Sequence, residues 1–288
     1  MADVATAHAR LRPLMFSIAY RMLGSVSEAE DVVQEAFLRM HRDATEPTSP
    51  DAYAATVTTR LAIDHLRLAR TRRERYVGTW LPEPLPTAED PDDPAAAAER
   101  TESLSMAFLV LLERLSPVER AVLVLREVFE YDYETVAEIV GRTTTNCRQI
   151  LARAHAHIGA ERPRFDSTPE QRDALARRFL AACHDGDLAG LERLLADDVT
   201  FFADGDGKPP AVTHPVVGRT QVARFLLGLF RQAARNRLRV VPMNVNGSPG
   251  ARVLAGEGRL ASVFALHVVG GRVRAIHNVI NPDKLRHL

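Results

Sequence analysis

Apolar residues recur every three or four positions between residues 9 and 42, which is the spacing of one face of an α-helix. Gly24-Ser25 interrupts the pattern, so it predicts two helices joined at that point. Ser27, followed by Glu30 three residues later, has the spacing of a capping box, and we expect it to cap the second helix.

A third helix is predicted from Asp51 to Glu74, because Pro47 and Pro50 interrupt the second one. Its last turns are almost entirely basic. The apolar positions expected to face a core are Tyr53, Val57, Leu61, Ile63 and Leu68.

Residues 77–101 are rich in Pro, Asp, Glu and Ala and show neither a helix nor a strand period. The prolines of Trp80-Leu81-Pro82-Glu83-Pro84-Leu85-Pro86 exclude regular helix and central strand. This stretch is therefore a linker. Because it holds the only tryptophan of the chain, we expect it to dock on a neighbouring surface.

Helical periodicity returns after the linker. A helix is expected over residues 104–115, and Ser116-Pro117 is typical of a new helix start. Residues 133–140 and 144–158 then predict a short helix and a longer one, joined by Gly141-Arg142-Thr143. This pattern predicts a helix-turn-helix, whose second helix carries basic and hydroxyl side chains on its outer face.

The last part of the chain, residues 169–288, changes from helices to strands. Gly270-Gly271 predicts a two-residue hairpin turn. Helices followed by an antiparallel meander predict an α+β unit with a curved sheet that can hold a pocket. The expected helices are 169–183, 188–195 and 218–234, and the expected strands begin at 199 and span 238–245, 251–256, 260–269 and 273–279.

Charge is sorted into blocks although the formal net charge is +0. Residues 60–75 and residues 142–164 each carry a net charge of +4, whereas residues 81–103 between them carry −6. Basic residues clustered on helices are typical of a phosphate-binding surface, and an acidic connector is repelled by DNA. The blocks therefore predict two DNA-binding elements separated by an acidic tether.

Length and composition indicate a globular protein of two to three compact units, 288 residues long. No apolar run approaches the length of a membrane span, and the first residues lack a signal-peptide pattern, so we expect a cytoplasmic protein without a membrane partner. Cys147 and Cys183 lie on different predicted helices and indicate neither a disulfide framework nor a metal site. The sequence shows no cofactor motif.

Particular motifs then resemble a known family. Glu30-Asp31-Val32-Val33-Gln34-Glu35-Ala36-Phe37 and Arg60-Leu61-Ala62-Ile63-Asp64-His65-Leu66-Arg67 resemble region 2 of extracytoplasmic-function (ECF) sigma factors. Residues 112–120 resemble the start of region 4. The linker motif, Asp204-Gly205-Asp206-Gly207-Lys208 and Asn281-Pro282-Asp283-Lys284-Leu285 resemble the SigJ-type subgroup, although Gly is expected at Asp206.

The resemblance implies a multidomain fold of two all-α sigma domains, a region 2 helical bundle and a region 4 helix-turn-helix, followed by an α+β NTF2-like (SnoaL-like) domain. The expected divisions are residues 1–76, an acidic linker 77–103, residues 104–163 and residues 169–288. It also implies that core RNA polymerase and promoter DNA are the partners. The polymerase, and not this chain, would then catalyse RNA synthesis.

The same resemblance assigns roles to individual residues. It implies polymerase contacts from Asp31, Gln34 and Glu35, and contacts with the promoter −10 element from Arg60, Asp64, Arg67, Arg70, Arg72 and Arg73. The recognition helix would contact the −35 element through Thr143, Thr144, Asn146, Arg148, Gln149 and Arg153. We further expect the C-terminal domain to pack against the linker and the first domain near Trp80–Pro84 and so to regulate activity in cis. The residues expected in this contact are Trp80, Leu81, Pro82, Glu83, Pro84, Asp204, Gly205, Lys208, Asn281, Pro282, Asp283, Lys284 and Leu285.

Two other functions compete with this interpretation. NTF2-like domains include enzymes, so Asp204, His214, His267 and His277 are candidate general bases, although their spacing indicates no acid–base pair. Binding of an unidentified small ligand by the C-terminal domain is favoured over catalysis. The second alternative is a one-component regulator that binds duplex DNA without polymerase.

Overall fold

The computed structural model describes residues 2–42, 49–73, 76–87, 103–159, 167–207 and 212–288, without the side chains of residues 2–7 and 70–72. Its contacts divide the chain into two compact units. The first contains Met1–Arg75 and Leu111–Arg162, and the second contains Tyr76–Val110 and Pro163–Leu288. The described part of the linker therefore groups with the C-terminal part of the chain.

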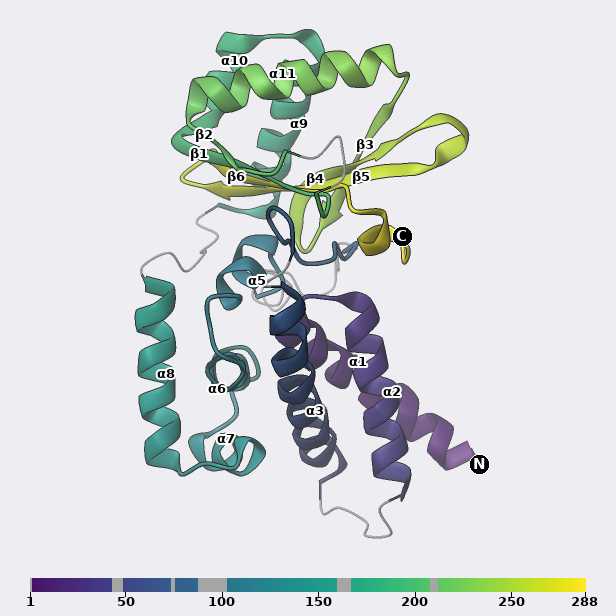
Figure 1. Ribbon diagram of the computed structural model, residues 1–288, viewed down its shortest axis with the longest axis vertical. Helices are drawn as coiled ribbons and strands as arrows, with labels where there is room; N and C mark the ends of the chain where they lie inside the picture. The colour runs from purple at the N-terminus through teal and green to yellow at the C-terminus, as the bar shows by residue number, and fades with distance from the viewer. Residues whose placement is uncertain (1, 43–48, 74–75, 88–102, 160–166, 208–211) are drawn as a thin grey trace. The chain divides into compact units, whose positions relative to one another are not determined.

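The first unit begins with three helices, α1 (Ala2–Leu23), α2 (Val26–Arg42) and α3 (Pro50–Arg73), shown in Figure 1. The break at Gly24 is confirmed, and this glycine has a φ of 65° that a side chain would strain. The predicted cap at Ser27 is wrong. Because α2 begins at Val26, the Ser25 hydroxyl accepts from the Glu28 amide at 3.2 Å instead.

The core face of α3 includes the predicted Leu61 and Ile63 together with Leu66 and Ala69, all buried, whereas Tyr53 and Val57 are half-buried. Leu68 was expected in this core but is 71% exposed. It lies two residues after Leu66, about 200° around the helix, and so faces away from the core.

The described residues that follow contain α5 (Met106–Leu112), α6 (Pro117–Glu127), α7 (Tyr133–Val140) and α8 (Thr144–Ile158). α5 is shorter than expected, and α6 begins with the predicted Ser116 cap in a full capping box. Gly141 ends α7 in the left-handed conformation, so α7 and α8 form the predicted helix-turn-helix. The division between the two units falls inside α5, between Val110 and Leu111.

The second unit is a six-stranded sheet in the order β2-β1-β6-β5-β4-β3, with three helices on one side (Figure 1). The antiparallel meander β3 to β6 is confirmed, whereas β1 runs parallel to β6 and β2 was not expected. The elements are α9 (Pro169–Asp185), α10 (Leu188–Leu194), β1 (Leu195–Asp204), β2 (Val216–Val217), α11 (Arg219–Arg235), β3 (Arg239–Val245), β4 (Ser248–Leu254), η2 (Gly256–Gly258), β5 (Leu260–Val269), β6 (Arg272–Val279) and η3 (Pro282–Leu285).

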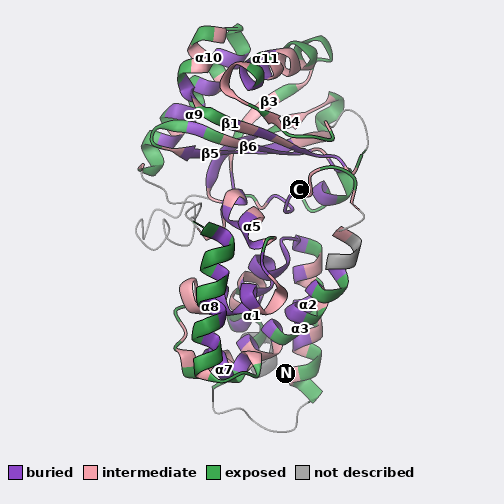
Figure 2. Cartoon of the chain, turned by 60° about the vertical axis from the view of Figure 1, so that its left-hand side comes forward, coloured by how far each residue is buried: buried purple, intermediate pink, exposed green. Residues whose placement is uncertain are grey.

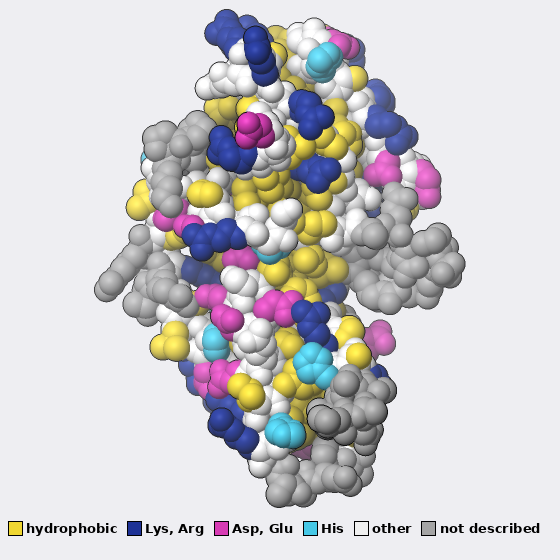
Figure 3. Space-filling view, turned by 90° about the vertical axis from the view of Figure 1, so that its right-hand side faces the viewer, with side chains coloured by type: hydrophobic (Ala, Val, Ile, Leu, Met, Phe, Trp, Pro, Cys, Tyr) yellow, Lys and Arg dark blue, Asp and Glu magenta, His cyan; other side chains and the backbone are white. Residues whose placement is uncertain are grey.

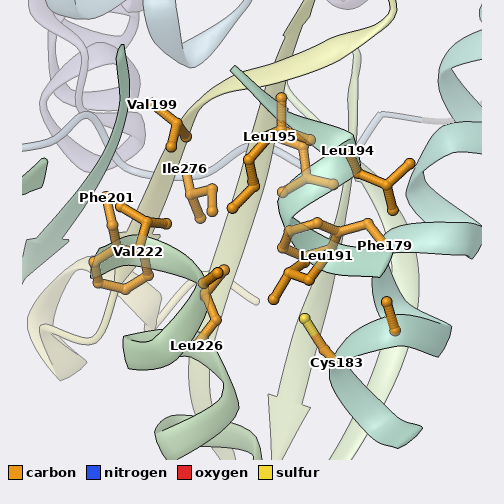
Figure 4. Close-up of a cluster of buried hydrophobic side chains, with 14 of the residues drawn as sticks. Phe179, Cys183, Leu191, Leu194, Leu195, Val199, Phe201, Val222, Leu226 and Ile276 are labelled. Atoms are coloured by element: carbon orange, nitrogen blue, oxygen red, sulfur yellow. The ribbon is translucent and has the colours of Figure 1, made fainter. Parts of the chain in front are cut away.

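Apolar side chains cover both faces of this sheet. On the helical side, Phe179, Leu191, Leu226 and Ile276 belong to one buried cluster (Figure 4). On the opposite side, Leu81 of the linker and Met106 of α5 pack in a second cluster with sheet residues that include Val263. The middle of β5 and the second half of β6 are consequently buried (Figure 2). The linker thus completes the fold of the C-terminal domain.

Candidate nucleic-acid interface and linker anchor

The polar face of α2 combines acidic, amide and apolar side chains. Asp31 and Gln34 are exposed, whereas Glu35 is half-buried and pairs with Arg39 at 2.6 Å. Leu38 lies on the same stripe, four residues after Gln34, and is 59% exposed. Sequence reasoning missed Leu38, although its position one turn after Gln34 is the signal that could have revealed it.

Arg60 of α3 binds the end of α7. Its Nε donates to the carbonyl oxygen of Ile139 at 2.9 Å, and its Nη2 donates to that of Glu138 at 2.8 Å. These carbonyls belong to the last turn of α7, where a helix lacks its own donors and carries partial negative charge. A residue expected on the −10 element therefore also links the two sigma regions.

The other basic residues of α3 differ in accessibility. Arg67 is exposed and pairs with the exposed Asp64 at 2.9 Å. The side chains of Arg70 and Arg72 lie outside the described residues. Arg73, expected to contact DNA, is instead only 14% exposed and forms a 2.5 Å ion pair with Glu113. That pairing commits the Arg73 guanidinium to the interior of the first unit.

Glu113 connects two arginines from different regions. Besides Arg73, it pairs with Arg120 at 2.8 Å, and Arg120 donates to the carbonyl oxygen of Met22 at 2.7 Å. Burial raises the pKa of Glu113, but the charges of Arg120 and Arg73 outweigh it and hold that pKa below its usual value. Sequence reasoning did not find this cluster, because its members are far apart along the chain.

Helix α8 presents the predicted recognition surface. Asn146, Arg148, Gln149 and Arg153 are exposed, whereas Thr144 is half-buried. The remaining candidate, Thr143, caps the helix by accepting from the Asn146 amide at 3.2 Å. Opposite this surface, α8 buries Cys147, Ile150, Leu151, Ala154 and Ile158 against the rest of the unit.

Arg148 lies against an aromatic ring. Its guanidinium is 4.7 Å from the centroid of the Tyr133 ring, and Arg126 is 4.8 Å from the same centroid. A cation over a tyrosine face is attracted by the ring quadrupole. Tyr133 therefore restrains Arg148 at the start of the recognition helix.

The linker is held by a buried carboxylate at the end of β1. We call Tyr76, Leu81, Asp204, Asn281 and Lys284 the linker anchor. The Asp204 side chain is fully buried and accepts from the Tyr76 hydroxyl, from the Leu81 amide at 2.6 Å and from Lys284 Nζ at 2.7 Å. Burial and the bond to Asp204 raise the pKa of Tyr76, so its phenol keeps its proton.

Lys284 contacts the linker directly. Its Nζ donates to the carbonyl oxygen of Leu81 at 2.5 Å and lies 4.0 Å from the centroid of the Trp80 ring. Asn281 donates to the Tyr76 hydroxyl at 2.9 Å, and its backbone amide donates to the Asp204 carbonyl at 2.9 Å. The motif that begins at Asp204 and the motif that begins at Asn281 are thus brought together at the linker.

The remaining residues expected in this contact lie around the anchor. Gly205, Pro82 and Glu83 are buried, and the Pro84 carbonyl lies 2.8 Å from His287 Nε2. Leu285 packs in the same apolar cluster as Leu81, whereas Asp283, next to Pro282 in η3, faces solvent and pairs with Arg286. Lys208 lies outside the described residues.

A second attachment, at the β3–β4 hairpin, was not predicted. Asn246 Oδ1 accepts from the Leu85 amide at 2.9 Å, and its Nδ2 donates to the Leu104 carbonyl at 3.0 Å. Gly247 donates to the Thr87 hydroxyl at 2.9 Å. The Asn246-Gly247 pair has the composition of a tight hairpin turn, which was the available signal.

Of the candidate catalytic residues, His267 and His277 lie near each other, whereas Asp204 bonds to the linker and His214 to Thr213. His277 is buried and stacks on Phe202, and burial together with nearby His267 lowers its pKa to about 3. His214 is exposed and bonds to the neighbouring Thr213 hydroxyl, while Asp204 belongs to the linker anchor. Within the described ranges, no group of three or more potential ligands is arranged to hold a metal ion.

Three families match the chain in order. Sigma-70 region 2 matches residues 8–72, Sigma-70 region 4 matches residues 105–158, and a SnoaL-like domain matches residues 176–279. The ECF RNA polymerase sigma factor SigJ of Mycobacterium tuberculosis is 38% identical over 286 residues, which cover 95% of this chain and 90% of SigJ. The chain belongs to the ECF RNA polymerase sigma factors.

Further relatives agree with this assignment. The probable ECF RNA polymerase sigma factor SigI of M. tuberculosis is 34% identical to this sigma factor over 95% of its chain and 92% of SigI. The crystal structure of M. tuberculosis SigJ superimposes with a TM-score of 0.78 at 36% identity, over 98% of both chains. The expected fold class, helical sigma regions followed by a SnoaL-like domain, is therefore confirmed. Among the described helices of the sigma factor, none has the length and hydropathy of a membrane span.

Proposed function

We propose that this sigma factor binds core RNA polymerase in the bacterial cytoplasm and directs initiation at promoters with −10 and −35 elements. One observation supports the proposal: both sigma regions occur in order, in a chain that is similar to a named sigma factor over nearly its full length. Run-off transcription by core polymerase, with and without the purified chain, tests it. Core polymerase that yields no more promoter-specific transcript with the chain than without it would contradict the proposal.

Polymerase binding is assigned to α2. Asp31 and Gln34 are exposed there beside Leu38, so the surface offers a negative charge next to an apolar side chain. Such a surface suits a basic partner with an apolar contact at its centre. Asp31→Lys should reduce retention of core polymerase at least tenfold. Asp185→Lys, at the exposed end of α9, is the matched control and should retain core polymerase normally.

Promoter binding is assigned to α3 and α8. Arg67 and Arg153 are exposed and available to phosphates, while Arg148 lies in the first turns of the recognition helix. Arg60 binds α7 carbonyls in this conformation, so its contact with the −10 element requires α3 to separate from α7. A gel shift with and without core polymerase separates this proposal from a one-component regulator. Equal duplex binding in both conditions would favour the regulator.

The C-terminal domain is proposed to regulate these contacts in cis. Residues 76–87 lead away from α3, and residues 103–110 lead towards α6. Both segments are attached to the same domain, the first through Asp204 and Asn246 and the second through Asn246 and the apolar cluster around Met106. By holding both ends of the tether, the domain sets how far apart the two DNA-binding regions can move.

Transcription assays test the regulatory role. Deletion of residues 281–288 removes two members of the linker anchor, so promoter output should differ from that of the intact chain. A chain of residues 1–165 should show a change in the same direction. Unchanged output from both would contradict regulation by the C-terminal domain.

No catalytic function is proposed for the SnoaL-like domain. A histidine with a pKa of about 3, as for His277, is a weak base at neutral pH. Asp204 binds the linker, so the candidate carboxylate is already committed to a structural contact. These observations favour regulation over turnover.

A further inference from the structure

The SnoaL-like domain contains a cavity between the sheet and α11. Its volume is about 180 Å³, and its walls are largely aromatic and aliphatic. Phe201 from β1, Phe230 from α11 and Phe264 from β5 supply rings from three directions. This cavity lies on the opposite side of the sheet from the linker cluster around Leu81, so it is separate from the linker anchor.

A polar side chain interrupts this apolar wall. Asn278 of β6 lies between Ile276 and Ile280 on the cavity side of the strand and pairs in register with Phe264. The residue is only 8% exposed, and its Oδ1 has no hydrogen-bond partner among the described residues. Buried amide oxygens are rarely left without a donor, because water is lost and nothing replaces it. The cavity therefore contains an unused hydrogen-bond acceptor.

The cavity opens towards the end of α11. Gln232 and Asn236 line it there and are exposed, so a small molecule can reach the interior at this end. In Figure 3, hydrophobic side chains gather in the upper half of the view, with Lys and Arg side chains around them. The described lining residues include no charged side chain, which disfavours a charged occupant in the interior.

The volume of the cavity and the chemistry of its walls together indicate which kind of ligand fits. A dry apolar cavity of about 150 Å³ accommodates a benzene ring, and this one is slightly larger at about 180 Å³. We propose that it binds a neutral single-ring phenol. The ring packs among Phe201, Phe230 and Phe264, and the hydroxyl donates to Asn278 Oδ1.

Calorimetric titration of the full chain with 4-methylphenol and with 1,4-dimethylbenzene tests the proposal. The two probes have similar size and shape, and only the phenol can donate a hydrogen bond. We expect 4-methylphenol to bind at least about tenfold more tightly than the hydrocarbon, because the hydrocarbon leaves the acceptor unpaired. Equal affinity for the two probes, or binding of neither, would overturn the proposal.

Two variants locate the site. Asn278→Leu should weaken phenol binding at least about tenfold and remove the preference over the hydrocarbon. Ala233→Trp, which fills the mouth of the cavity, should abolish binding of both probes. Asn244→Leu, on β3 outside the cavity, is the matched control and should bind like the unaltered chain. If Asn278→Leu does not fold, Ala233→Trp still decides, because unchanged phenol binding in that variant would place the phenol elsewhere. This assay needs no polymerase, so it is independent of the transcriptional proposal.

Discussion

Lys284 and Asp204, which are 80 positions apart in the chain, form a 2.7 Å ion pair beneath the linker. The Asp204 side chain is fully buried and that of Lys284 is 9% exposed. Breaking one partner of a buried pair is costly because the other charge remains without compensation. The pair therefore attaches the linker at a point where neither charge can return easily to water.

Lys284→Met should destabilise the second unit by about 3–5 kcal/mol and release the linker. The only tryptophan, Trp80, packs on Lys284, so urea unfolding followed by tryptophan fluorescence reports both effects. Arg286→Met is the control, because it removes only an exposed pair with Asp283 that contributes at most about 1 kcal/mol. Equal stabilities for the two variants would contradict an anchoring role of Lys284.

Glu113→Gln should destabilise the first unit by about 3 kcal/mol at neutral pH, since Arg73 and Arg120 then lose their shared carboxylate. The folded state lowers the pKa of Glu113, so this stabilisation is present above its unfolded value and is lost as pH falls through the lowered one. Chemical unfolding at neutral and acidic pH should therefore show the two proteins converging in acid. Glu138→Gln, an exposed change on α7, should follow the unaltered chain throughout.

Arg148→Ala should weaken binding of the holoenzyme to the −35 element by about 1–3 kcal/mol and change its base preference. Tyr133→Leu removes the ring beneath Arg148 and should cost less, about 0.5–1 kcal/mol. Binding to a set of duplexes with single base changes measures both effects. Arg178→Ala, exposed on α9, provides the reference. An unchanged base preference in Arg148→Ala would exclude a base-reading role.

His277 should make the second unit sensitive to acid. Its folded pKa of about 3 lies below the ordinary 6.5, so below pH 6.5 the unfolded chain binds a proton that the folded chain does not. Stability should therefore fall by about 1.4 kcal/mol per pH unit between roughly pH 6.5 and pH 3. His277→Phe should remove this contribution in urea unfolding at several pH values, whereas His214→Phe, on the surface, should retain it.

Asp206 occupies a position that favours glycine. Its φ is 51°, a left-handed conformation that costs a residue with a side chain more than it costs glycine. Asp206→Gly should therefore stabilise the second unit by about 0.5–1 kcal/mol in thermal unfolding. Gly207→Ala is the opposing test, because its new Cβ would lie 2.8 Å from Val77. Destabilisation by both changes would show that the Asp206 side chain makes a contribution larger than its backbone strain.

Local pattern predicted most of the helices and the meander. The Ser116-Pro117 start, the Gly141 turn and the period of residues 144–158 involve neighbours in the chain, and each appears where it was expected. The cap was predicted at Ser27, two residues too late: Ser25 and Ser27 are both competent cap residues, but α2 begins at Val26 and Ser25 caps it. The periodicity of the sequence does not show which of two nearby residues caps a helix.

The sequence by itself determined the order of the elements, the helix-turn-helix and the family, because these depend on spacing and on motifs within short segments. Only the tertiary structure decided what individual charges do. Arg73 carries the same charge as Arg67, yet Arg73 pairs with a carboxylate 40 residues away while Arg67 faces solvent. Likewise, Asp204 at the end of β1 pairs with Lys284 of η3, because the fold brings these two elements together. Long-range pairs form only when folding brings their elements together, so no local pattern encodes them.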